Sequence, residues 1–371
     1  MRKRGLLSLL LAGAMFCMTG MTAFATAEAT PTETTAETAA ATENVADPHE
    51  GMYRNELSGE WISSALATQR PVAIMVDNEK TALAHYGVNQ SDIVYEIMNS
   101  TANGRITRLM CLVKDYAKIT QFGSIRSVRP SNFMLAAEYN AILVHDGGPF
   151  YINDYIAQPW SDNLSAGFAR FSNGKRTEFT EYVTYNAYTN KTKGRTYAGL
   201  KTRLAQAGFS KTYNEYYAGP NFIFSEAQIG LDAEADVRTA NAVSLPFPHN
   251  SSKLNYNAST GTYDYYEYGK AHIDALTNTQ TTFKNVIIQN CSFTQYDPNG
   301  YMVYNLVTGE NSSNGYYLTN GKAIPITWSK AASNAQTVYR NANTGEELVL
   351  NTGKTYIAIV PSDSWAQVSI Q

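Results

Sequence analysis

One continuous stretch of the chain, residues 122–148, most constrains the fold. It reads FGSIRSVRPSNFMLAAEYNAILVHDGG and combines two arginines, a predicted helix start, an apolar run and a glycine pair. Arg126 and Arg129 precede Pro130 and Ser131, where proline ends an extended segment and the serine hydroxyl is suited to cap a helix. Because a helix N-terminus carries unpaired N–H groups and a partial positive charge, this pattern predicts an anion-binding site beside it.

A buried strand is expected directly after this helix. Residues 141–144 are apolar without interruption, which is typical of an inner strand of a sheet. Residues 145–148, with the sequence HDGG, follow it, and ligand-contacting loops commonly lie at the carboxyl ends of strands in α/β sheets. The ligand-contacting residues expected from this stretch, besides the two arginines, are Ser127, His145, Gly147 and Gly148.

Three further strands are predicted before this stretch. Residues 71–76 form a continuous apolar run, and residues 93–98 and 106–113 are strand-like segments joined by an Asn-Gly turn, which indicates a hairpin. Alternation then places Glu96 and Arg108 face to face across the hairpin, either as a plain ion pair or as part of the ligand site. The polar residues at the end of the first run, Asp77 and Asn78, are expected at that site too.

Helical signals complete the first region. Segments 149–157, 177–188 and 196–207 are predicted helices, the last ending at Gly208. Arg170 lies in a polar loop between two phenylalanines, and we expect it to contact the ligand as well. Strands interleaved with helices in this way indicate a mixed α/β domain.

The pattern changes beyond residue 225. Short strand-like runs recur between Asn-Gly and Thr-Gly turns, from residues 262–268 to residues 356–361. This spacing predicts an all-β domain. The expected fold is therefore α+β, with an N-terminal mixed α/β domain at residues 51–225 and a C-terminal all-β domain at residues 226–371.

The N-terminal segments predict export from the cytoplasm. A basic start, an apolar stretch and small residues before the cleavage point indicate a signal peptide over residues 1–25, with a retained membrane anchor as the alternative. Cys17 follows a phenylalanine rather than a small residue, so we do not expect it to carry a lipid. Residues 26–50, mainly Ala, Thr and Glu, predict a disordered acidic linker. We expect the mature chain to lie in the cell envelope or outside the cell, without a transmembrane span.

Charge and cysteine content limit the classes of binding partner that we expect for this protein. Removal of the three basic residues of the signal leaves 26 basic against 32 acidic residues, and six of these acids lie in the linker, so the folded part is neutral. A neutral body excludes a basic face for nucleic acid. Cys111 and Cys291 each lie in an apolar run, where we expect buried free thiols rather than a disulfide. No cysteine spacing typical of a metal site occurs, and neither a metal nor a cofactor is expected.

These motifs resemble the YerB-like family of Gram-positive extracytoplasmic proteins, which are usually lipoproteins. The resemblance rests on residues 71–78 (PVAIMVDN), 91–96 (SDIVYE), 106–108 (ITR), 123–129 (GSIRSVR), 145–148 (HDGG), 284–289 (KNVIIQ) and 350–355 (LNTGKT). It covers roughly residues 55–371 and implies a mixed α/β domain followed by a β domain. The chain departs from the family pattern at Cys17, which lacks a lipoprotein signal, and after Arg170, where residues 176–186 lack the family's histidine.

Two functions fit these residues. In the first, the arginines and His145 bind an anionic ligand, namely peptidoglycan, another wall glycan or a phosphate, and the β domain contacts a wall polymer or an envelope protein. In the second, an envelope hydrolase or lyase uses Glu96 as general acid/base, because apolar neighbours raise the pKa of a carboxyl group. The set is rich in cations, and no Gly-x-Ser-x-Gly, His-Glu-x-x-His or P-loop motif occurs, which favours binding.

Overall fold

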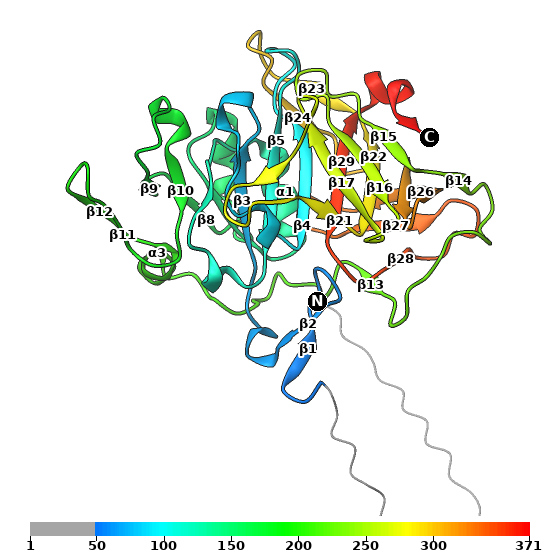
Figure 1. Cartoon of the computed structure of the whole chain (residues 1–371), viewed down its shortest axis with the longest axis horizontal. Helices are drawn as coiled ribbons and strands as arrows, with labels where there is room; N and C mark the ends of the chain where they lie inside the picture. The colour runs from blue at the N-terminus through cyan, green and yellow to red at the C-terminus, as the bar shows by residue number, and fades with distance from the viewer. Residues whose placement is uncertain (1–48) are drawn as a thin grey trace, which may run out of the picture. The chain divides into compact units, whose positions relative to one another are not determined.

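An eleven-stranded sheet is the central element of the structure, and both halves of the chain contribute strands to it (Figure 1). This computed structural model describes residues 49–371, so the signal peptide, the linker up to residue 48 and Cys17 lie outside the described residues. In order across the sheet the strands are β14 (Arg238–Thr239), β26 (Lys322–Lys330), β25 (Ser313–Thr319), β22 (Asn285–Cys291), β29 (Thr355–Pro361), β4 (Ile93–Met98), β5 (Thr107–Val113), β3 (Val72–Asp77), β7 (Ile142–His145) and β8 (Asn163–Ser165), with β27 (Thr337–Asn341) alongside β26.

The two halves meet where β4 and β29 pair in parallel, from Ile93 opposite Thr355 to Ile97 opposite Ile359. Every residue of both strands is buried, as expected for strands in the middle of a sheet that is covered on both faces. Residues 49–371 accordingly belong to one compact unit. The structure is mostly β.

A six-stranded sheet covers one face of the large sheet. Along β17 every second side chain is buried, which turns Tyr263, Tyr265 and Glu267 inward. Tyr263 and Tyr265 share one apolar core with Val286 and Ile288 of β22, so the two sheets pack face to face. The strands of this second sheet are β18 (Lys270–Ala271), β17 (Thr262–Glu267), β16 (Lys253–Asn257), β15 (Ala242–Ser244) and β30 (Ser369–Ile370), with β21 (Thr282–Phe283) on β17.

The helices are few and short. The helix α1 is buried all round and packs through Phe133 and Leu135 into a second core, which also contains Trp328 of β26. The α-helices are α1 (Pro130–Ala137), α2 (Asn153–Ile156) and α3 (Leu200–Ala207), and the 3₁₀ turns are η1 (Ser64–Leu66), η2 (Lys80–Ala82), η3 (Val88–Gln90), η4 (Tyr116–Lys118), η5 (Phe150–Ile152), η6 (Thr177–Phe179) and η7 (Ser362–Gln367). Within residues 49–371, no helix has the length and apolarity needed to cross a bilayer.

Smaller strand groups surround these layers. They are β1 (Met52–Arg54) with β2 (Trp61–Ser63); β10 (Glu181–Val183) between β6 (Phe122–Gly123) and β9 (Ala169–Arg170); β11 (Tyr188–Asn190) with β12 (Arg195–Tyr197); β13 (Ile223–Phe224) with β28 (Val349–Leu350); β19 (Ile273–Asp274) with β20 (Thr279–Gln280); and β23 (Phe293–Gln295) with β24 (Met302–Tyr304).

Most of the predicted elements are confirmed. The runs at 71–76, 93–98, 106–113 and 141–144 are strands, and α3 ends at Gly208, which adopts a left-handed conformation with φ +72°. Cys111 and Cys291 are buried free thiols, and burial raises the pKa of each to about 12.

Two local predictions are wrong. The helix expected over residues 177–188 is a single 3₁₀ turn followed by β10, because the Glu-Tyr-Val segment supplies an inner strand next to β6 and β9. The helix α1 begins at Pro130 rather than after Ser131, with Arg129 as the N-cap residue. Proline fits the first helical position because its missing N–H has no partner there in any case. The Ser131 hydroxyl instead accepts a hydrogen bond from the N–H of Tyr304 at 2.8 Å.

Candidate functional site

Three arginines converge on one cavity of about 680 Å³. They are Arg108 from β5, Arg126 from the segment before α1, and Arg129 at the start of α1. The remaining residues that line the cavity are Asp77, Glu79, Asn99, Ser100, Ala102, Asn103, Ile106, His249, Asn299 and Tyr301. We call this space the arginine cavity. The structure therefore brings together three of the four arginines that were expected at the ligand site.

The register of the central strands decides which side chains reach this cavity. Asp77 at the end of β3 lies opposite Arg108 on β5, and Arg108 lies opposite Ile97 on β4. Since directly opposed residues project to the same face, Glu96 projects to the other face, together with its partner Leu109. The expectation that Glu96 and Arg108 face one another across the hairpin is thus wrong, because the strands are offset by one residue from that pairing.

Arg108 is held by neutral acceptors rather than by a carboxylate. One of its terminal nitrogens donates to the Asn99 side chain at 2.7 Å and to the Ser127 carbonyl and hydroxyl oxygens at 2.5 and 2.8 Å. Its Nε atom is buried and has no hydrogen-bond partner among residues 49–371. Burial lowers the pKa of Arg108 to about 9, and repulsion from Arg129 adds to this effect. The cation is therefore poorly compensated by the protein itself.

Arg129 lies in a similar environment. Its Nε donates to the Asn99 carbonyl at 3.2 Å, one terminal nitrogen donates to the Val128 carbonyl at 2.9 Å, and the guanidinium lies 4.5 Å from the ring centre of Tyr301. Burial lowers the pKa of Arg129 to about 10. Within residues 49–371, neither Arg108 nor Arg129 forms an ion pair with a carboxylate, whereas Arg126 pairs with Asp77. Two guanidinium groups thus remain without a counter-charge.

His145, Gly147 and Gly148, the other predicted ligand residues of the central stretch, pack against the segment that carries Arg126 and Arg129. His145 is buried, and its Nδ1 atom lies 2.9 Å from the carbonyl oxygen of Gly147. The same carbonyl oxygen also accepts a hydrogen bond from the N–H of Val128 at 3.1 Å. A side chain at Gly148 would meet Ile152 at 2.5 Å, so glycine permits close packing there. The structure therefore places these residues next to the arginine segment, and the cavity lining does not include them.

Arg170 lies in a separate cluster. It forms an ion pair with Glu181 at 2.5 Å and a longer one with Asp146 at 3.7 Å. Asn78 belongs to the hydrogen-bonded group around Glu96, in which its side-chain amide donates to Thr107 at 2.9 Å and to Glu96 at 3.4 Å. Neither Arg170 nor Asn78 lines the arginine cavity.

Glu96 is buried on the opposite face of the sheet. It accepts hydrogen bonds from Thr107 and Ser252, each at 2.7 Å, from Tyr265 at 2.9 Å, and from a short contact with Tyr356. Burial raises the pKa of Glu96, and these hydrogen bonds oppose the shift. With four hydroxyl donors around it and no exposed surface, Glu96 connects β4 to β5, β29 and the second sheet.

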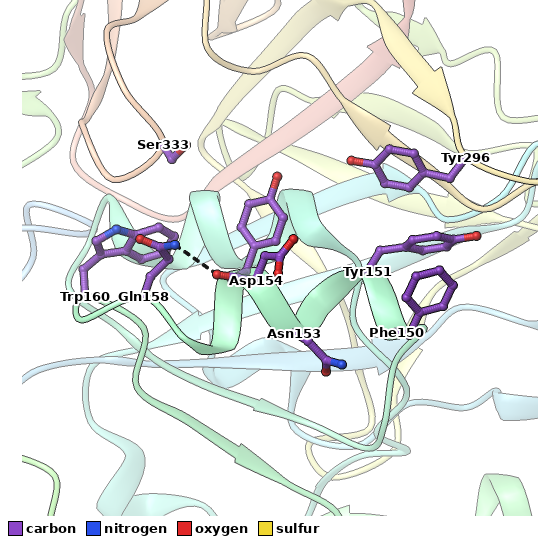
Figure 2. Close-up of a pocket in the computed structure, with 9 residues that line it drawn as sticks. Phe150, Tyr151, Asn153, Asp154, Gln158, Trp160, Tyr296 and Ser333 are labelled. Carbon is purple, nitrogen blue, oxygen red and sulfur yellow. Dashed lines mark hydrogen bonds between the residues drawn. The ribbon is translucent and has the colours of Figure 1, made fainter.

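A second cavity, of about 690 Å³, was not anticipated from the sequence (Figure 2). Its lining is largely aromatic, with Phe150, Tyr151, Tyr155, Trp160 and Tyr296, and we call it the aromatic cavity. The ring centres of Tyr151 and Tyr296 are 4.7 Å apart, and Figure 2 shows Trp160 at the other end of the cavity. Only the short helical segment after Gly148 was predicted, because Tyr296 lies in the loop after β23, about 140 residues further along the chain.

The loop between β23 and β24, residues 296–301, borders both cavities. Tyr296 lines the aromatic cavity, whereas Asn299 and Tyr301 line the arginine cavity. Tyr151 donates a hydrogen bond to Asp297 in this loop at 2.7 Å, which fixes the loop to the segment that follows Gly148. The two cavities are therefore neighbours across a single loop.

Comparisons with known proteins match this architecture. The family model described as "Protein of unknown function (DUF3048) N-terminal domain" matches residues 57–208, and the model of the corresponding C-terminal domain matches residues 243–357. A curated relative, "Putative lipoprotein YerB" of Bacillus subtilis (strain 168), is 25% identical over 333 residues, which cover 84% of this chain and 88% of the relative.

A solved structure shows the same fold. The crystal structure of the YerB protein from Bacillus subtilis superposes with a TM-score of 0.67 at 20% identity, and covers 86% of this chain and 99% of that chain. The two family models together match well over half of the chain. The chain therefore belongs to the DUF3048 family of YerB-like proteins, with both the N-terminal and the C-terminal domain of that family.

Proposed function

We propose that this protein is a cell-envelope protein that binds an anionic ligand in the arginine cavity. The ligand class is a wall glycan, such as a peptidoglycan fragment, or another compound that carries carboxylate or phosphate groups. The observation that carries the proposal is the pair of cations, Arg108 and Arg129, that line one cavity and have no carboxylate partner in the described part of the chain. An enclosed cation without a counter-charge is costly, and a bound anion removes that cost with charge-assisted hydrogen bonds.

The helix α1 supports the same assignment. Arg129 is its N-cap residue, and the adjoining Ser127 orients both Arg108 and Arg129 through its hydroxyl group. The positive end of the helix dipole and the guanidinium groups therefore act on the same region. In this proposal the mixed α/β region, residues 51–225, supplies the cations, and the β region, residues 226–371, supplies the loop at 296–301.

The neighbouring aromatic cavity favours a glycan as the ligand. Aromatic side chains offer flat apolar faces with polar edges, which suit the faces of sugar rings. Tyr151 and Tyr296 present such faces in the aromatic cavity, one loop away from the arginines. A glycan that carries an acidic substituent would place its sugar against the tyrosines and its charged group against the arginines.

The N-terminal sequence and the curated relative support a location in the cell envelope. The N-terminal sequence has the features of a signal peptide, and the curated relative bears the name of a lipoprotein. We include an envelope location in the proposal. An envelope hydrolase or lyase with Glu96 as general acid/base remains the alternative, supported by the raised pKa of Glu96, although Glu96 lines neither of the two cavities described above.

Calorimetric titration of the mature protein tests the proposal, with inorganic phosphate and with purified muropeptides as probes. Arg129→Ala is expected to weaken binding by about 10- to 150-fold, which corresponds to about 1.5–3 kcal/mol for a charge-assisted contact. Arg176→Ala is the matched control, because Arg176 is exposed outside the cavity and forms an ion pair with Glu178. Absence of binding to both probes, or an equal loss in the control, would contradict the proposal.

The aromatic cavity needs a separate measurement. Tyr296→Ala is expected to weaken muropeptide binding by about 1 kcal/mol while the affinity for phosphate stays the same, since phosphate has no ring to stack. Trp61→Ala serves as the control, because Trp61 is an exposed aromatic residue that lines neither cavity. An equal effect of Tyr296→Ala on both probes would mean that the mutation disturbs the loop at 296–301 rather than a sugar contact.

A further inference from the structure

Two histidines and a glutamate form a buried cluster on the other side of Asp77. His85 follows η2, Glu267 ends β17, and His272 follows β18. One ligand atom from each residue lies within 4.8 Å of the others. The Nδ1 atom of His85 is 2.8 Å from Nε2 of His272, which in turn is 3.6 Å from Oε1 of Glu267. All three side chains are almost inaccessible to solvent.

The hydrogen bonds of His85 determine which of its nitrogens carries the proton. Its Nε2 atom lies 2.7 Å from the carbonyl oxygen of Asp77, which can only accept a hydrogen bond. Nε2 is therefore the protonated nitrogen. With its proton on Nε2, the neutral imidazole ring presents a lone pair at Nδ1.

The same reasoning applies to His272. Its Nδ1 atom lies 2.9 Å from the hydroxyl oxygen of Thr281, and that hydroxyl donates its own proton to Asn89 at 2.8 Å. Nδ1 of His272 is therefore the donor, and Nε2 presents a lone pair. Two lone pairs thus face one another at 2.8 Å between His85 and His272, an arrangement that a shared cation would stabilise.

Glu267 is the third part of the cluster. Neither of its carboxylate oxygens has a hydrogen-bond partner within the described residues. The nearby side-chain amides donate elsewhere: that of Asn78 to Thr107 and Glu96, and that of Asn250 to the Asn78 carbonyl and to Tyr268. A buried carboxylate without donors is rare and costly, which makes it a second observation that points to a missing ligand.

We propose that His85, Glu267 and His272 bind a divalent transition-metal ion, of which Zn²⁺ fits the donors best. Two neutral imidazoles and one carboxylate form a ligand set typical of zinc. The Asp77 carbonyl and the Thr281 hydroxyl hold the opposite N–H groups of the two rings, as outer hydrogen bonds do in established zinc sites.

The surroundings provide a route for the ion. Glu267 and His272 line a cavity of about 330 Å³, together with Leu83, Ala84 and Ile273. Three protein ligands leave one position of a tetrahedral zinc ion for water or for a group that enters from this cavity. The site is independent of the anion-binding proposal, although the carbonyl that accepts the hydrogen bond from His85 belongs to Asp77, whose side chain lines the arginine cavity.

Metal analysis of protein without an affinity tag tests the site, since a polyhistidine tag would itself bind zinc. After treatment with a chelator and dialysis, titration with Zn²⁺ is expected to give one bound ion per chain by mass spectrometry of the elements. The ion is expected to raise Tm by roughly 3–6 °C at a free concentration far above Kd. Substitution with Co²⁺ is expected to give the absorption spectrum of a tetrahedral site.

Three variants separate a specific site from adventitious binding. Glu267→Gln keeps the shape of the side chain and removes its charge, and it is expected to weaken zinc binding at least about tenfold, as is Thr281→Val. Glu178→Gln, at a carboxylate outside the cluster that pairs with Arg176, is the matched control and should bind zinc like the wild type. Zinc binding that is absent in the wild type, or unchanged in Glu267→Gln, would overturn the proposal and leave Glu267 as a protonated acid beside His272.

Discussion

Nε of Arg126 lies 2.8 Å from Oδ2 of Asp77, and Asp77 is also the cross-strand neighbour of Arg108. The Asp77 side chain is only 4% exposed, whereas that of Arg126 is 31% exposed. Of the carboxylates that line the arginine cavity, Asp77 is the one paired with an arginine. Loss of Arg126 and loss of Asp77 should therefore change anion binding in opposite directions, and the two losses should differ in their effect on the free energy of unfolding.

The first prediction concerns this pair. Arg126→Ala is expected to weaken phosphate binding and to lower the free energy of unfolding by about 1–3 kcal/mol, because buried Asp77 loses its partner. Asp77→Asn is expected to strengthen phosphate binding about fivefold, since one competing negative charge disappears while solvated Arg126 remains. Calorimetry and urea denaturation measure both effects. If Asp77→Asn weakens phosphate binding instead, the anion does not occupy this cavity.

A second prediction separates the roles proposed for Glu96. Glu96→Gln is expected to lower the free energy of unfolding by about 1–3 kcal/mol, because the new amide cannot accept from all four hydroxyl donors. Phosphate affinity should stay within about twofold of the wild type. Tyr356→Phe, which removes one of the donors, should cost about 1 kcal/mol. Turnover of muropeptides that disappears in a fully stable Glu96→Gln variant would support the hydrolase instead.

A third prediction concerns the connection between the two family domains. Nζ of Lys330 on β26 lies 2.8 Å from Oε1 of Glu138 at the end of α1, and both side chains are at most 1% exposed. Lys330→Met leaves a buried carboxylate unpaired and is expected to cost about 3–5 kcal/mol. Unfolding should remain a single transition by calorimetry, because β4 and β29 belong to the same sheet. Two separate transitions would show that the domains fold independently.

The fourth prediction concerns pH. Asp92 is half-buried, and desolvation raises its pKa from 3.8 to about 6 despite hydrogen bonds from Asn55 at 2.7 Å and from the N–H of Lys114 at 2.8 Å. The folded state therefore binds more protons than the unfolded state between pH 3.8 and 6, so the contribution of Asp92 to stability falls as the pH rises through this window.

Urea denaturation of the wild type and of Asp92→Asn, at pH 4 and at pH 7, isolates this contribution. The free energy of unfolding of the wild type, measured relative to the variant, is expected to fall by about 2–3 kcal/mol between the two pH values. A difference that does not change with pH would mean that Asp92 titrates as an exposed carboxylate does.

The sequence by itself determined the local elements and the chemistry of the central stretch. Apolar runs such as residues 71–76 and 93–98 became buried strands, because a continuous apolar segment has no stable solvated face. Pro130 and the arginines around it indicated a helix start with cations beside it, and Arg126 and Arg129 lie there. The resemblance to the YerB-like family rested on the same short motifs, and the family matches confirm it.

Only the tertiary structure decided which of these residues meet. The register of β4 against β5 placed Glu96 and Arg108 on opposite faces, and a shift by one residue is not visible in the alternation of either strand alone. The aromatic cavity, and the cluster of His85, Glu267 and His272, join residues more than a hundred positions apart. Such contacts depend on the packing of two sheets and on the parallel pairing of β4 with β29. The periodicity of a sequence indicates only local secondary structure, so it does not predict contacts between distant segments.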